Sequence, residues 1–234
     1  MKPLIFFVLV LIISFMTSCN KSYDDVSGSG DAIIVVKQSG ISTVYGYALY
    51  AYTYGKFQSV KATCTLDPSK TYTLKINQEY KTNFYYEFSD DEFTTTKPTA
   101  STFNFSAVFD NGSTAEFQDE VSAKVLAVPV IKDISYDSTT DETNVTWSAV
   151  SGAESYSVMI LKGSEVVFGS SELASTLRTY AVSSSTTGWI TDFTPVAGDT
   201  YTVRLNAYLY EPSGNSYNLQ AVSIAEETIV WGSN

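Results

Sequence analysis

Apolar and polar residues tend to alternate with a period of two from residue 31 onward, and turn-forming residues interrupt the alternation about every 8–12 residues. No segment of this region has the 3.6-residue period of a long amphipathic helix. Successive side chains of a strand point to opposite faces, so the pattern is typical of half-buried strands. The sequence contains 17 Tyr and 13 Phe, residue types that are enriched in strands. We therefore expect an all-β fold of sandwich type.

The length of 234 residues suits two domains of about 100 residues each after an N-terminal leader. Hydrophobic residues make up 44% of the chain and charged residues 17%, so the chain can bury a core and is not wholly disordered. Val128-Pro129 is the expected hinge, because proline cannot donate to a strand ladder. We expect two β-sandwiches, over 31–127 and 128–234, and the first is immunoglobulin-like by pattern alone.

Seven strands are expected in each half. In the first half they span 32–37, 44–54, 57–65, 71–77, 83–88, 102–109 and 115–124. In the second half they span 130–136, 144–149, 155–162, 165–168, 188–191, 200–210 and 217–231. The clearest turns are 67–70 and 110–113, and the Asn111-Gly112 pair is a strong hairpin signal because both residues accept positive φ.

Three segments of the second half carry a family pattern. Val145-Thr146-Trp147 looks like a second strand with a core Trp, 156–158 looks like a third strand, and 193–203 looks like a corner in which an apolar residue precedes Pro, Gly and Tyr201. This half therefore resembles a fibronectin type III domain. Phe193 stands where Leu is usual, and the segment 172–187 is longer than in the family. The resemblance implies a fold and no activity, because such sandwiches host unrelated roles.

Charge and composition exclude several function classes. The chain has 14 Lys and Arg against 25 Asp and Glu, a formal net charge of −11, and this balance argues against a nucleic-acid partner. The sequence contains no His, which removes His-dependent nucleophile sites, His-ligated zinc and a His general base.

Residues 1–18 are typical of a secretory signal. Lys2 precedes an apolar run from Leu4 to Met16, and Thr17-Ser18 closes the run. The run is too short and wrongly flanked for a spanning helix, and a retained N-terminal anchor is the alternative.

The motif Met16-Thr17-Ser18-Cys19 resembles the bacterial lipobox, with Met16 in place of the usual Leu. The resemblance implies that Cys19 is lipidated, becomes the first mature residue and anchors the protein in the outer membrane. Residues 20–25 resemble the acidic export signal of Bacteroidota-type surface lipoproteins, which implies display on the cell surface; a solvated tether is the alternative. Residues 26–30 are rich in Gly and Ser, so 19–30 is expected to be the lipidated Cys and a flexible tether.

Cys64 is then alone and cannot form an intrachain disulfide. Alternation places it on one face with Val60, Ala62 and Leu66, which predicts a buried, inert thiol.

Neither a catalytic nor a metal site is expected. Gly-x-Ser-x-Gly and the phosphate-binding loop motif are absent. Acidic residues cluster at 90–92, at 119–120, and at Asp137 with 141–142, in the Ser- and Thr-rich contexts of solvated turns. Their spacing does not match a calcium-binding EF-hand loop, although loop carboxylates leave calcium open as an alternative. No cofactor is expected, and the protein is predicted to be non-enzymatic.

Tyr50, Tyr52 and Tyr54 share one face of an expected strand. Facing outward, they would form an aromatic strip that could stack on sugar rings or on a partner surface. The alternative, which we favour, is that they pack inward with their hydroxyls at the sandwich edge.

Trp189 is expected to point outward. In the fibronectin-like pattern the inward positions of its strand, counted back from Phe193, are Ile190 and Gly188. An exposed Trp often marks a contact, and packing against the 172–187 segment or the first domain is the equally weighted alternative. Tyr208 could add to an aromatic rim, although ordinary strand packing is preferred, and Trp231 is expected to plug the end of its strand.

These features predict a surface lipoprotein that binds a glycan, or is accessory to a glycan-uptake complex, with Trp189, Tyr50, Tyr52, Tyr54 and Tyr208 as candidate ligand-binding residues. Accessory lipoproteins of starch-uptake-like systems look broadly similar at their N-terminal end, but they usually add carbohydrate-binding modules for which this chain is too short. The alternative is a structural or adhesive surface protein that uses its sandwiches as spacers or protein-contact modules.

Overall fold

The computed structural model describes residues 27–78, 82–212 and 218–233. The expected signal, the lipobox-like motif with Cys19 and most of the tether lie outside these residues. Within the described part the regular structure is β, apart from one short 3-10 helix, η1 (Asp90–Glu92). The expectation of an all-β fold with sandwich-type sheets is confirmed.

The first half contributes seven strands. They are β1 (Ser29–Ser39), β2 (Ser42–Tyr52), β3 (Phe57–Cys64), β4 (Asp67–Ile76), β5 (Asn83–Glu87), β6 (Ser101–Phe109) and β7 (Thr114–Val121). The sheet order β1-β2-β5-β4-β3-β6-β7 rolls the strands around one core, so that β7 returns to the side of β1. Cys64 is buried in this core, as expected.

The second half contributes eight strands. They are β8 (Ile131–Asp137), β9 (Glu142–Trp147), β10 (Ser155–Lys162), β11 (Glu165–Gly169), β12 (Leu173–Ala174), β13 (Thr179–Val182), β14 (Thr200–Tyr210) and β15 (Leu219–Val230). One sheet has the order β13-β9-β8, and it faces the sheet β11-β10-β14-β15.

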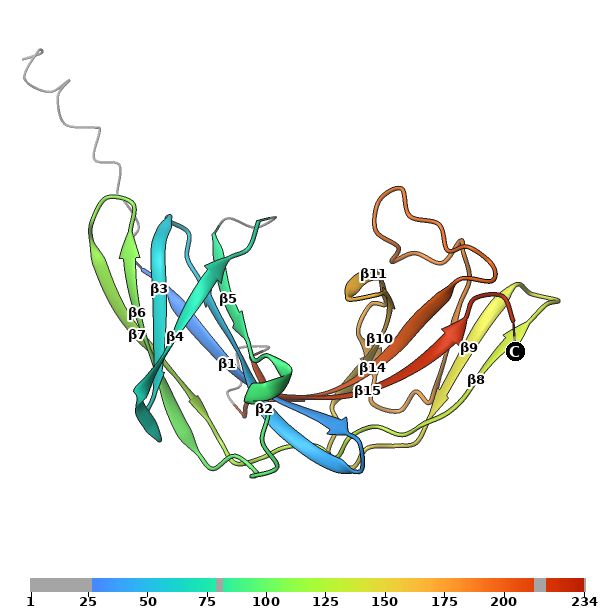
Figure 1. Ribbon diagram of the computed structural model, residues 1–234, viewed down its shortest axis with the longest axis horizontal. Coiled ribbons are helices and arrows are strands. Elements are labelled where there is room, and N and C mark those ends of the chain that lie inside the picture. Colours follow the sequence, from blue (N-terminus) through green and yellow to red (C-terminus); the bar gives the residue numbers. More distant parts are fainter. Residues whose placement is uncertain (1–26, 79–81, 213–217, 234) are drawn as a thin grey trace, which may run out of the picture.

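The two halves share one hydrogen-bonded sheet. β15, near the end of the chain, pairs with β1 in parallel, from Ile34 beside Ala221 to Lys37 beside Ile224. Figure 1 shows this junction in the middle of the molecule, where the start of β15 (red) lies beside β1 (blue). The sheet therefore runs without interruption from β11 to β7.

Both cores lie on the same face of this shared sheet. Ile34, Val36 and Ala221 belong to the first core. On β15, Ser223 donates from Oγ to the carbonyl of Leu126 at 2.9 Å, and Leu126 belongs to the second core. Residues two apart on a strand share a face, so the residues between these point to the opposite side of the sheet.

The second half has the corner that the fibronectin-like pattern implies. The Tyr201 hydroxyl accepts a hydrogen bond from the Val196 amide at 3.0 Å, which is the geometry of a tyrosine corner. Trp147 is 1% exposed and packs against Tyr156 in the second core. Trp231 is buried directly after β15, as expected.

Three local expectations are wrong. Residues 188–191 do not form a strand and make one isolated bridge, whereas β13 lies inside the segment expected to be an insertion. The turn expected at 67–70 falls instead at 65–66, and β4 starts at Asp67. The tether ends earlier than expected, because β1 begins at Ser29 and a Cβ on Gly30 would lie 2.4 Å from the Phe105 ring.

Candidate functional site

A groove of about 1200 Å³ lies on the face of the shared sheet that points away from the two cores. Its lining includes Asp90 of η1 on the side of the first half and Val166 of β11 on the side of the second half, and Figure 1 shows where these two elements lie. Four neighbouring strands form its floor. The apolar part comes from Ile33 and Val35 of β1, Val222 and Ile224 of β15, and Met159 and Leu161 of β10, and the polar part comes from β14, which lies between β10 and β15. Both halves of the chain are needed to build this groove.

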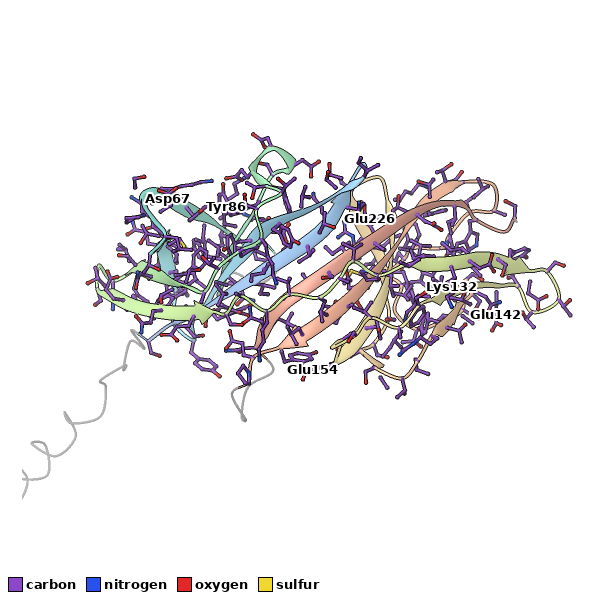
Figure 2. The ribbon with its side chains drawn as sticks, turned by 90° about the horizontal axis from the view of Figure 1, so that it is seen from below. Asp67, Tyr86, Lys132, Glu142, Glu154 and Glu226 are labelled. Atoms are coloured by element: carbon purple, nitrogen blue, oxygen red, sulfur yellow. The ribbon has the colours of Figure 1, made fainter. Side chains whose placement is uncertain are left out.

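The cations of the groove are paired with carboxylates. Lys37 Nζ lies 2.5 Å from Asp90 Oδ1, and Arg204 Nε lies 2.6 Å from Glu226 Oε1. The Arg204 guanidinium is thus already neutralised by a carboxylate. Figure 2 shows Glu226 in the middle of the molecule, where β15 crosses between the halves. Because each positive charge has a carboxylate beside it, the groove is poorly suited to an anionic ligand.

Tyr208 lines the groove from β14 and is held by a small polar network. Its hydroxyl lies 2.7 Å from Ser157 Oγ, and Asn206 Nδ2 donates to the same oxygen at 3.0 Å. Asn206 and Ser157 are buried, so the network fixes the phenol ring in place. Burial raises the pKa of Tyr208 above its usual value, and the phenol stays neutral at physiological pH.

Tyr50 lines the same groove from the first half of the chain. It is half-buried, and its hydroxyl donates to Glu87 Oε1 at 3.1 Å. Burial, together with the negative charge of Glu87, raises the pKa of Tyr50. The structure therefore brings Tyr50 and Tyr208, two of the five candidate residues, to one surface.

The expected inward packing of the tyrosine strip is wrong. Leu49 and Ala51 are fully buried in the first core, and alternation places the tyrosines on the other face. Tyr52 stacks on Tyr50 with ring centroids 6.3 Å apart and is 37% exposed, while Tyr54 is 95% exposed. Neither Tyr52 nor Tyr54 lines the groove, so the three residues do not act as one platform.

The expected outward position of Trp189 is also wrong. Its ring lies 4.9 Å from Phe168 and 5.5 Å from Trp231, centroid to centroid, and Nε1 donates to the carbonyl of Ser183 at 3.0 Å. Ser183 belongs to the 172–187 segment, so the alternative interpretation holds. Ile190, expected inside, is 43% exposed.

Gly188 explains why the period-two count from Phe193 gave the wrong face for Trp189. This glycine has φ +130°, and a Cβ there would lie 2.3 Å from the carbonyl oxygen of Gly169. The chain approaches β11 too closely for a side chain, and the backbone leaves the extended region. A period-two count from Phe193 cannot cross such a residue.

Three carboxyl groups meet where the two halves join, which the sequence pattern did not indicate. Asp119 is buried, and its Oδ2 accepts a hydrogen bond from the Ala32 amide at 2.8 Å. Burial and the charge of Asp119 raise the pKa of both Asp31 and Glu211 to about 7. One oxygen on each of these two residues is inaccessible to solvent and has no hydrogen-bond partner among the described residues. The sequence predicts a solvated turn at 119–120, and this expectation is wrong for Asp119 because β7 packs on β1, a long-range contact that leaves no local signal.

The other acidic clusters behave as solvated turns. η1 contains 90–92. Partial burial of the Glu92 carboxylate would raise its pKa, but hydrogen bonds from Lys70, Ser89 and Tyr86 stabilise the charged form more strongly and lower the pKa to about 2.

In residues 27–78, 82–212 and 218–233, no three Asp, Glu or Cys side chains are arranged to hold a metal ion. No helix of the described part is long and apolar enough to cross a membrane.

Comparison with known proteins finds similarity only among solved structures. No protein-family model matches the chain, and no curated protein matches it. A two-domain fibronectin type III segment of chicken tenascin is 15% identical over 84% of this chain and 97% of that one, with a TM-score of 0.31. The FN1–FN3 domains of chicken CNTN1 are 11% identical over 89% and 64%, with a TM-score of 0.31. The fibronectin(III)-like modules of Clostridium thermocellum CbhA are 14% identical over 86% and 94%, with a TM-score of 0.26.

Proposed function

We propose that the protein is a non-enzymatic lipoprotein, anchored in the outer membrane through Cys19 and displayed on the cell surface, that binds a neutral glycan in the groove of its shared sheet. The observation that carries the proposal is that Tyr50 and Tyr208, from opposite halves of the chain, line one groove. The lipobox-like motif and the acidic residues that follow it support the cellular location.

The chemistry of the groove supports a neutral sugar chain as the ligand. Tyr rings offer apolar faces for stacking and hydroxyls at their edges. Asn206 adds an amide beside Tyr208, and the Lys37 and Arg204 charges are already matched by carboxylates. A uronic acid or sulfated sugar would have to compete with those carboxylates for its counter-charge.

A glycan array tests this proposal with the chain from residue 19 to 234 carrying Cys19→Ser, which removes the lipid attachment site. We expect saturable binding to a neutral polysaccharide that Tyr208→Ala abolishes. Tyr54→Ala is the matched control, since Tyr54 is exposed and lies outside the groove. Binding that survives Tyr208→Ala, or a blank across neutral plant, host and microbial glycans, would overturn the glycan assignment.

The alternative function, a structural or adhesive surface protein, has one observation in its favour. The groove floor includes a row of aliphatic side chains from the two central strands, Ile33, Val35, Val222 and Ile224, and such a surface also suits a protein partner. A blank glycan array together with retained surface display would favour this role.

A further inference from the structure

The pairing between β1 and β15 covers only part of β15. Its last partners are Lys37 and Ile224, after which β1 turns into β2. From Ala225 to Val230, β15 pairs with β14 on one side, and none of the described strands pairs with its other side. The exposure of β15 also changes where its pairing with β1 ends. Gln220, Ala221 and Ser223 are buried, whereas 226–228 are exposed.

The backbone groups that point to this open side can be identified. The Trp231 amide donates to the carbonyl of Asp199 at 2.9 Å, on the β14 side. The β14–β15 register is regular from Val230 back to Ala221, and in an antiparallel pair the hydrogen-bonding direction alternates along the strand. The amides of Glu226, Thr228 and Val230 and the carbonyls of Glu226 and Thr228 therefore point away from β14, to the open side. The Val230 carbonyl already accepts a hydrogen bond from the Ser233 amide at 3.3 Å.

A second open edge runs beside the first. β8 pairs with β9 alone among the described strands, so its other edge is also unpaired. A groove of about 420 Å³ lies between β8 and β15, lined by residues that include Ile134 and Ile229. It meets the large groove at Glu227, which lines both. We call this smaller groove the slot; Lys132, labelled on β8 in Figure 2, is among its lining residues.

We infer that the slot between β15 and β8 binds an extended polypeptide segment of a partner protein, which adds to the shared sheet as a strand along 225–230. An extended segment fits this site because the same edge of β15 already pairs with an extended strand, β1, over 221–224. Backbone hydrogen bonds would supply the affinity, as in other cases of strand addition. Ile134 and Ile229 favour a segment with alternating apolar side chains.

The test uses the full chain, purified in detergent, and a phage-displayed library of random nonapeptides as the probe. An enriched peptide is synthesised, and its affinity is measured for the wild type, Thr228→Pro and Thr228→Ala. The proline removes one outward-pointing amide and leaves the bonds to β14 intact, while the alanine removes the same side chain and keeps the amide. We expect Thr228→Pro to bind the peptide about tenfold more weakly than the wild type, and Thr228→Ala to bind it with nearly the affinity of the wild type.

Hydrogen exchange on the wild type gives a readout that does not depend on the folding of a variant. The bound peptide should slow exchange of the 226, 228 and 230 amides selectively. Failure to enrich any peptide, equal binding to Thr228→Pro, or unchanged exchange along 225–230 would each overturn the inference. A dimer of the chain that Thr228→Pro dissociates would also overturn it, because the occupant would then be a second copy.

Discussion

The sequence predicts a core position for Trp147 and a surface position for Trp189, but both side chains pack against the interior of the second half. Trp147 is fully enclosed by the second core, and Trp189 is wedged between Phe168 and Trp231 with its indole nitrogen bonded. We expect Trp147→Ala to lower the free energy of unfolding by about 3–5 kcal/mol because it leaves a large cavity. Trp189→Ala should cost about 1–3 kcal/mol, less because the side chain is only partly buried. Urea unfolding followed by circular dichroism measures both.

Tyr54→Ala serves as the surface control in the same series. Tyr54 is 95% exposed, so its removal should change the free energy of unfolding by less than about 0.5 kcal/mol. A Trp189→Ala protein as stable as Tyr54→Ala would contradict the packing described for Trp189.

Gly30 gives a sharp test at the level of an element, the first strand. A methyl group there would meet the Phe105 ring of β6 at 2.4 Å, across the first core. We expect Gly30→Ala to destabilise the protein by about 1–3 kcal/mol through overpacking. Thermal unfolding measures the change.

Gly169→Ala is the matched control for Gly30→Ala. Gly169 ends β11, and an added Cβ there would meet nothing within 4 Å. The control should therefore stay within about 0.5 kcal/mol of the wild type. Equal stability of the two alanine variants would show that 29–30 belong to the tether, as the sequence alone suggested.

Local patterns predicted most strands but none of the long-range features that build the candidate site. Alternation located β2, β3, β6 and β14 closely, because their two faces meet a core and a solvated surface. It failed at 188–191, where Gly188 breaks the period, and at β13, which lies in a segment taken for an insertion. The groove depends on Val35 lying beside Val222, and a parallel pairing between strands so far apart in the sequence leaves no local signal.

At the scale of the whole molecule, the shared sheet should make the two halves unfold together. All three Trp residues lie in the second half, so their fluorescence reports on that half alone. Phe103→Ala, in the first core, should nevertheless lower the midpoint of the fluorescence transition as much as that of the circular dichroism transition. Two separate transitions, with the fluorescence midpoint unchanged, would show that the β1–β15 ladder does not couple the halves.

Stability should fall as pH rises through the neutral range. The Asp31 and Glu211 carboxyls have folded-state pKa values of about 7, raised by burial and by neighbouring charge, against 3.8 and 4.5 in the unfolded chain. The folded state therefore holds protons that the unfolded chain has lost between about pH 4 and 7, so the free energy of unfolding decreases across that window and levels off above it. Urea midpoints at pH 5, 6, 7 and 8 measure the trend.

Asp31→Asn should flatten this pH profile, because the amide cannot ionise. Asp90→Asn is the control, since Asp90 is exposed and its pKa is lowered by Lys37, so it titrates below the window. A wild-type stability that rises between pH 5 and 8 would contradict the described environment of the carboxyl groups.

The parallel pairing of β1 with β15 has a consequence for the order of folding. β1, the first strand of the first half, needs β15 as a neighbour, and β15 is synthesised much later than β1. Until then Ile33 to Val36 present a bare apolar edge, and edges of this kind recruit other chains. Folding that waits for such a distant contact is slow. The first half therefore cannot complete its sheet before β15 is available, and truncation before Leu219 should yield aggregates rather than a folded first half.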